Sequence, residues 1–72
     1  MISKRKYEGK VKVVKAKDGK EYDILLFSSP NGMTTEVAYP VGEFYGMKGD
    51  EFYVNTYRTK DGYYKSYLVD LK

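Results

Sequence analysis

The sequence contains no cysteine, no histidine and no tryptophan. Without cysteine the chain can form no disulfide, and it offers no thiol as a nucleophile or metal ligand. Without histidine, the Ser-His-Asp and Cys-His catalytic arrangements and most zinc sites are excluded. We therefore expect a protein that is not an enzyme and that uses no metal or other cofactor.

Long apolar segments are also missing. The longest apolar run is Ile24-Leu25-Leu26-Phe27, whereas a membrane-spanning helix needs about 20 residues. The basic start of the chain, Met1–Lys6, is not followed by the apolar stretch of a secretory signal. With 72 residues, the chain is expected to form one small soluble domain, residues 1–72, in the cytoplasm and away from membranes.

The residue pattern has a period of two, which is typical of strands that are buried on one face. Asp18-Gly19, Ser29–Gly32 and Asp61-Gly62 are strong turn signals. Together they predict an all-β domain with strands near residues 7–13, 20–28, 33–41, 51–59 and 63–71 and with no long helix. Such a chain forms a small barrel or sandwich.

Alternation within each strand predicts which side chains point inward. In the first strand we expect Val11 and Val13 to face the core, with Lys10 and Lys12 outside. In the last strand the polar Ser66 and Asp70 share a face with Tyr64, so Tyr67 is predicted to point inward. The full predicted core is Val11, Val13, Tyr22, Ile24, Leu26, Val37, Tyr39, Phe52, Val54, Tyr67, Val69 and Leu71.

Aromatic residues make up 17% of the chain, as nine tyrosines and three phenylalanines. This is more than so small a core can hide. Tyrosine combines a hydroxyl that tolerates water with a flat ring that can stack, so some of these rings suit a half-exposed binding face. The alternative for any single tyrosine is that it simply packs in a strand, where its intrinsic preference is high.

The net charge of +3 conceals an uneven distribution. Residues 1–20 contain eight basic and two acidic residues, a charge of +6, and the remaining 52 residues carry −3. A concentrated basic segment is what a polyanionic partner would select, although lysines near turns also serve solubility and protect strand edges.

Residues 46–70 resemble the C-terminal hairpin of OB-fold single-stranded-DNA-binding proteins. The resemblance rests on Lys48-Gly49-Asp50 before a strand, on Tyr57-Arg58 within it, and on the turn Lys60-Asp61-Gly62 before a closing strand. The segment before residue 51 is too short for the usual OB helix, and the acidic tail of the bacterial proteins is absent. Both departures are shared with the compact phage and plasmid proteins, which implies a role in DNA replication, a host-cytoplasm location for a phage protein, and a homodimer.

Single-stranded nucleic acid requires cations along the phosphates and flat faces for the bases. On this basis the chain is predicted to be an OB-like five-stranded antiparallel barrel that binds single-stranded DNA, or RNA, without sequence preference. Since a five-strand meander also fits an SH3-like barrel, a protein that coats duplex DNA stays open, as does a protein-interaction module such as a phage inhibitor. The candidate nucleic-acid-binding residues are Lys10, Lys12, Lys15, Tyr53, Tyr57, Arg58, Lys60, Tyr63, Tyr64 and Lys65.

Overall fold

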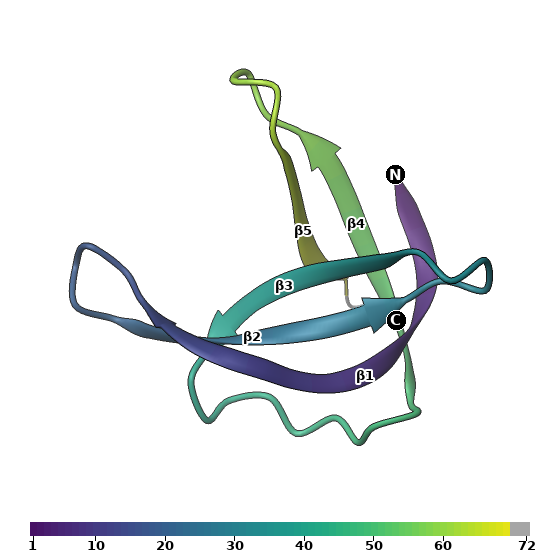
Figure 1. Ribbon diagram of the computed structural model, residues 1–72, viewed down its shortest axis with the longest axis horizontal. Coiled ribbons are helices and arrows are strands. Elements are labelled where there is room, and N and C mark those ends of the chain that lie inside the picture. The colour runs from purple at the N-terminus through teal and green to yellow at the C-terminus, as the bar shows by residue number, and fades with distance from the viewer. Residues whose placement is uncertain (70–72) are drawn as a thin grey trace.

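Five strands and their connections make up the computed structural model, which describes residues 1–69 (Figure 1). The strands are β1 (Ile2–Lys15), β2 (Glu21–Ser28), β3 (Thr34–Pro40), β4 (Glu51–Arg58) and β5 (Tyr64–Val69). No helix occurs within residues 1–69. The all-β prediction is therefore confirmed.

The three predicted turns join β1 to β2, β2 to β3 and β4 to β5. In each turn a glycine (Gly19, Gly32 or Gly62) has φ between 84° and 88°. Its N–H donates to the carbonyl oxygen three residues earlier, at 2.9–3.0 Å. Glycine adopts this left-handed conformation without steric cost, and it is the residue that completes a tight three-residue hairpin loop. The turn chemistry in the sequence thus sets all three hairpins.

The strands form one antiparallel sheet in the order β3-β2-β1-β4-β5. The order 4-1-2-3 is a Greek key, and a five-stranded, partly open Greek-key barrel is the OB arrangement. The predicted five-stranded antiparallel, OB-like architecture is therefore confirmed, but its strands do not form a simple meander, because β4 returns to pair with β1. Within the described residues β3 and β5 meet only through side chains, with the Thr35 and Ser66 hydroxyls 2.8 Å apart, so the sheet does not close by backbone pairing.

Strand β1 belongs to both halves of the sheet. Its residues Ile2–Lys6 pair with β4, and its residues Lys6–Lys15 pair with β2. Two register shifts interrupt the second pairing, one between Tyr7 and Gly9 and one between Lys10 and Lys12. Such bulges bend a strand and increase its twist. The β1–β4–β5 half consequently stands up from the β1–β2–β3 half (Figure 1).

The core lies between these halves and draws on every strand. Its buried members are Tyr7, Leu25, Phe27, Val37 and Val54. Tyr39, Phe44, Phe52 and Leu68 pack against them. The rings make tilted and edge-to-face contacts, such as Phe27 with Phe52 at 5.9 Å between centroids. Phe44 comes from the connection 41–50, which closes one end of the barrel.

Several predicted core positions are wrong. Val11 and Val13 are 51% and 45% exposed. Val11 is the extra residue of a bulge, whereas Val13 lies opposite the inward Asp23 but at the border of the core. In β2 the inward residues are Asp23, Leu25 and Phe27 rather than Tyr22, Ile24 and Leu26, although Ile24 is buried on the outer face. Both faces of this strand are largely apolar, so the alternation alone could not indicate which face points inward.

The inward face of β5 was also predicted incorrectly. Leu68 lies opposite Val54 and packs on the core, whereas Tyr67 is 49% exposed and lies opposite Asn55 on the outer face. Ser66 can point inward because its hydroxyl is 2.8 Å from the hydroxyls of both Thr35 and Thr56. The predictions for Asp70 and Leu71 fall outside the described residues.

Candidate nucleic-acid interface

Three tyrosines lie together on the outer face of β4 and β5. Tyr53 and Tyr57 alternate along β4, and Tyr67 lies across from the residue between them, Asn55. Directly opposed residues in an antiparallel pair share a face. By that register Lys65 lies beside Tyr57, and Lys4 of β1 lies beside Tyr53. We call Lys4, Tyr53, Asn55, Tyr57, Lys65 and Tyr67 the tyrosine face.

All three tyrosine rings are accessible, and two of them, Tyr57 and Tyr67, are also held in place. Tyr53, Tyr57 and Tyr67 are 39%, 44% and 49% exposed. The rings of Tyr57 and Tyr67 meet edge to face, with centroids 5.9 Å apart. Asn55 Nδ2 donates to the Tyr67 hydroxyl at 2.6 Å. A ring fixed in this way loses little side-chain entropy when a flat partner stacks on it.

The remaining predicted residues of the second hairpin do not share this face. Tyr64 lies opposite Arg58, and both have the inward alternation of Thr56 and Ser66. This pair is the one next to the turn, past the last core residues, and Tyr64 is therefore 72% exposed although its position alternates inward. Lys60 and Tyr63 belong to the turn. Tyr64 therefore does not share the outer face of Tyr53 and Tyr57.

The three candidate lysines of β1 lie in the other half of the sheet. Lys10 is opposite Leu25 on the inward side, and Lys12 is opposite Ile24 on the outward side. The prediction that they share a face is wrong, since Val11 is the extra residue of a bulge between them. Lys15 lies at the far end of the β1–β2 hairpin, opposite Glu21. None of the three pairs with a residue of β4 or β5.

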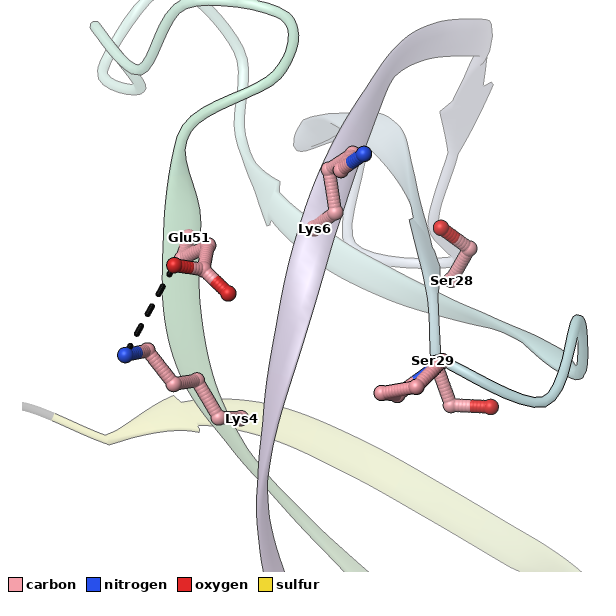
Figure 2. A pocket seen from close by; sticks show the side chains of 6 residues that line it. Lys4, Lys6, Ser28, Ser29 and Glu51 are labelled. Carbon is pink, nitrogen blue, oxygen red and sulfur yellow. Dashed lines mark ion pairs between the residues drawn. The ribbon is translucent and has the colours of Figure 1, made fainter.

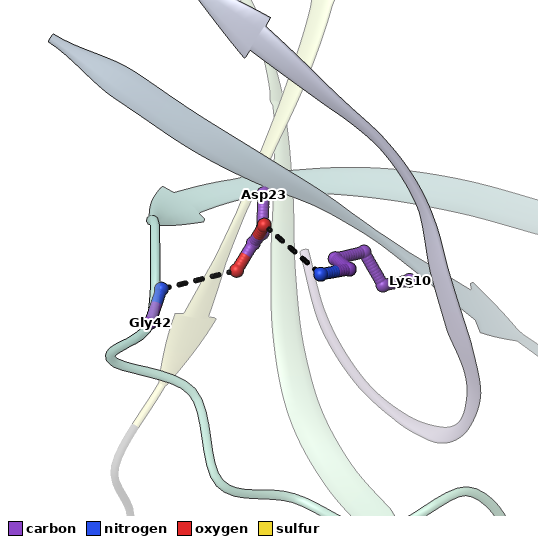
Figure 3. A network of polar contacts seen from close by, with 3 residues as sticks. All are labelled: Lys10, Asp23 and Gly42. Atoms are coloured by element: carbon purple, nitrogen blue, oxygen red, sulfur yellow. Dashed lines mark hydrogen bonds and ion pairs between the residues drawn. The ribbon is translucent and has the colours of Figure 1, made fainter.

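Lys10 serves a local structural purpose. Its Nζ lies 3.7 Å from Oδ1 of Asp23, a residue only 6% exposed, while the Gly42 N–H donates to Asp23 Oδ2 at 3.2 Å (Figure 3). The hydrogen bond fastens the start of the connection 41–50 to β2, and the lysine charge offsets part of the cost of burying the carboxylate, whose Oδ1 accepts no hydrogen bond within residues 1–69. Burial, together with the charge of Asp23, raises the pKa of the neighbouring Tyr7.

Two members of the tyrosine face were missed by the sequence analysis. Lys4 belongs to the basic start of the chain, which was placed before the first predicted strand, although Ile2–Lys6 is part of β1 and pairs with β4. Tyr67 was assigned to the core. The sequence did contain a signal for the correct face. If the purely apolar Leu68 points inward, the adjacent Tyr67 points outward and its hydroxyl stays in water.

Comparison with models of known families, with curated proteins and with solved structures finds no match to this chain. Within residues 1–69 no helix is long and apolar enough to cross a membrane. The same residues contain no group of three acidic, histidine or cysteine side chains placed to hold a metal ion. The case for a function therefore rests on the geometry of the tyrosine face.

Proposed function

We propose that this chain binds single-stranded DNA, or RNA, without catalysing a reaction, and that the bases stack on the tyrosine face. The observation that carries the proposal is the cluster of three half-exposed tyrosines, two of them in edge-to-face contact, with a lysine on either side. Stacking on an aromatic ring requires an unpaired base, because in a duplex both base faces are already covered. Such binding tolerates any sequence, since every base has a π-face.

Charge and fold support the same function. The tyrosine face is bordered by the positive charges of Lys4 and Lys65, which can follow the phosphates of a strand that crosses β4. A Greek-key barrel of five strands is a common scaffold for single-strand binding. The resemblance of residues 46–70 to OB-fold single-strand-binding proteins points the same way.

The test replaces single tyrosines by leucine, which keeps bulk and β-preference but removes the aromatic stacking surface. Tyr57→Leu and Tyr67→Leu are each expected to weaken binding of oligo-dT by about 1–3 kcal/mol, or roughly 5- to 150-fold. Tyr45→Leu is the matched control, because Tyr45 is 88% exposed but lies in the connection 41–50. It should bind like the parent chain in a fluorescence-anisotropy titration.

The alternatives give different outcomes in the same titration. Tighter binding of the duplex than of the single strand would favour a protein that coats duplex DNA. If no nucleic acid binds even at low salt, the proposal is wrong. The exposed tyrosines would then be read as anchors of a protein–protein interface.

A further inference from the structure

A hollow of about 350 Å³ lies next to the tyrosine face, on the outer side of β1 (Figure 2). It is bounded by the start of β4 on one side and by the turn between β2 and β3 on the other. Lys4 is a member of both the hollow and the tyrosine face, so the two surfaces are continuous. The residues that line the hollow are Lys4, Lys6, Ser28, Ser29, Pro30 and Glu51.

The hollow has a net positive charge, with two lysines and one glutamate in its lining. Lys4 Nζ is 3.6 Å from Glu51 Oε1, and both side chains are more than half exposed to water. Within residues 1–69 Lys6 makes no ion pair. Figure 2 shows Lys4 turned toward Glu51 and away from Lys6, whose ammonium group lies on the side of β1 that faces β2.

The serine hydroxyls of the hollow are already used as donors. Ser28 donates to Glu8, and Ser29 donates to Asn31. The donors left for a ligand are therefore the two ammonium groups, which lie on the same face of β1 two residues apart. Two flexible cations at the border of an aromatic surface suit a phosphate diester, since each can supply a charge-assisted hydrogen bond to its oxygens.

We propose that this hollow holds one backbone phosphate of the bound strand between Lys4 and Lys6, and that Glu51 limits the affinity by holding Lys4 in the free protein. The proposal rests on the proposed function, because the phosphate belongs to the strand that stacks on the tyrosine face. The strand then runs from β5 across β4 and over β1. Replacing the Lys4–Glu51 ion pair by a contact between Lys4 and a phosphate costs little free energy, because an exposed ion pair contributes little to stability.

The first test is the salt dependence of oligo-dT binding by Lys6→Gln. Loss of one phosphate contact on a single strand should lower the slope of log affinity against log salt by about 0.7. Lys6→Arg keeps the charge and should retain the slope of the parent chain. Because Lys6 is exposed, both variants should fold, which circular dichroism verifies.

The second test is Glu51→Gln, which releases Lys4 and removes the carboxylate that would face the phosphate. Affinity for oligo-dT should rise about two- to fivefold, the range expected of an exposed pair. Glu36→Gln is the matched control, since Glu36 is an exposed residue of β3 and its replacement removes the same charge elsewhere. It should leave the affinity near that of the parent.

The outcomes separate the two proposals. If Tyr67→Leu weakens binding while Lys6→Gln keeps the parent slope, the phosphate site is wrong and the tyrosine face stands. An equal gain from Glu51→Gln and Glu36→Gln would also reject the site, because it would reflect overall charge alone. If Tyr67→Leu binds like the parent, the proposed function itself fails.

Discussion

The two halves of the sheet share a core but present different outer faces. On the β1–β2–β3 half the outer face centres on Ile24, which is only 8% exposed between Lys12 and Ala38. On the β1–β4–β5 half the corresponding positions hold Tyr53, Tyr57 and Tyr67, all of them substantially exposed. The half that is richer in lysine is therefore not the half that displays stacking surfaces. Charge density in the sequence indicates a polyanionic partner, but exposed rings indicate where that partner would lie.

The strongest test of the shared core is Phe27→Ala. Phe27 is fully buried and contacts Tyr7, Phe44 and Phe52, so it joins both halves. Removing its ring should cost about 3–5 kcal/mol, a large part of the stability of so small a domain. Tyr67→Ala removes a ring from one outer face only and should cost about 1 kcal/mol or less. Urea unfolding followed by circular dichroism measures both, and similar midpoints would show that the halves do not depend on a common core.

The proposed division of binding between the halves is tested by two lysine substitutions that remove the same charge. Lys65→Gln, beside Tyr57, should lower the salt slope for oligo-dT by about 0.7. Lys12→Gln, in the other half, should leave the slope unchanged. If instead Lys12→Gln lowers the slope and Lys65→Gln does not, the strand follows the β1–β2 hairpin, as the distribution of charge in the sequence first suggested.

The junction of the halves can be probed through pH. Tyr7 lies where β1 passes from β4 to β2, and burial raises its pKa above the ordinary value near 10. In that range the unfolded chain loses the Tyr7 proton before the folded chain does, so stability is full below pH 10 and falls as pH rises through the folded-state pKa. Tyr7→Phe keeps the ring contacts and should flatten this fall. The measurement is the urea midpoint of both proteins between pH 8 and 11. If the midpoint falls equally with pH in both, Tyr7 does not contribute to the loss of stability.

The fold was largely predictable because local signals agreed with one another. The Asp-Gly and Asn-Gly turns, the period of two and the short connection 41–50 all favoured hairpins without a helix. The Greek-key order was not predictable in this way, since nothing local records that Lys4 lies beside Tyr53. That pairing depends on β1 being long enough to reach two neighbours, which became visible only when Ile2–Lys6 proved to be strand.

The candidate site was predicted only in part. Tyr53 and Tyr57 were placed correctly outside, because Phe52 and Val54 are clear inward residues. The faces of Tyr64 and Tyr67 were predicted the wrong way round, because Ser66 was judged too polar for the interior. In the structure the Ser66 hydroxyl lies inside, where it bonds to the hydroxyls of Thr35 and Thr56. The homodimer and the binding of nucleic acid stay predictions. Of the two β1 lysines only Lys10 was misplaced, because the bulge at Val11 puts it on the inward side, while Lys12 is outward as predicted.

The smallest expected effect is that of Val13→Ala. The sequence pattern places Val13 in the core, where loss of two methyl groups would cost about 2 kcal/mol. In the structure Val13 is 45% exposed, because it lies opposite Asp23 at the border of the core. Its truncation should therefore cost no more than about 0.5 kcal/mol. Val37→Ala, the same chemical change at a side chain that is 1% exposed, should cost the full 2 kcal/mol. Urea unfolding of the two variants compares them directly, and equal losses would mean that Val13 is as deeply buried in the core as Val37.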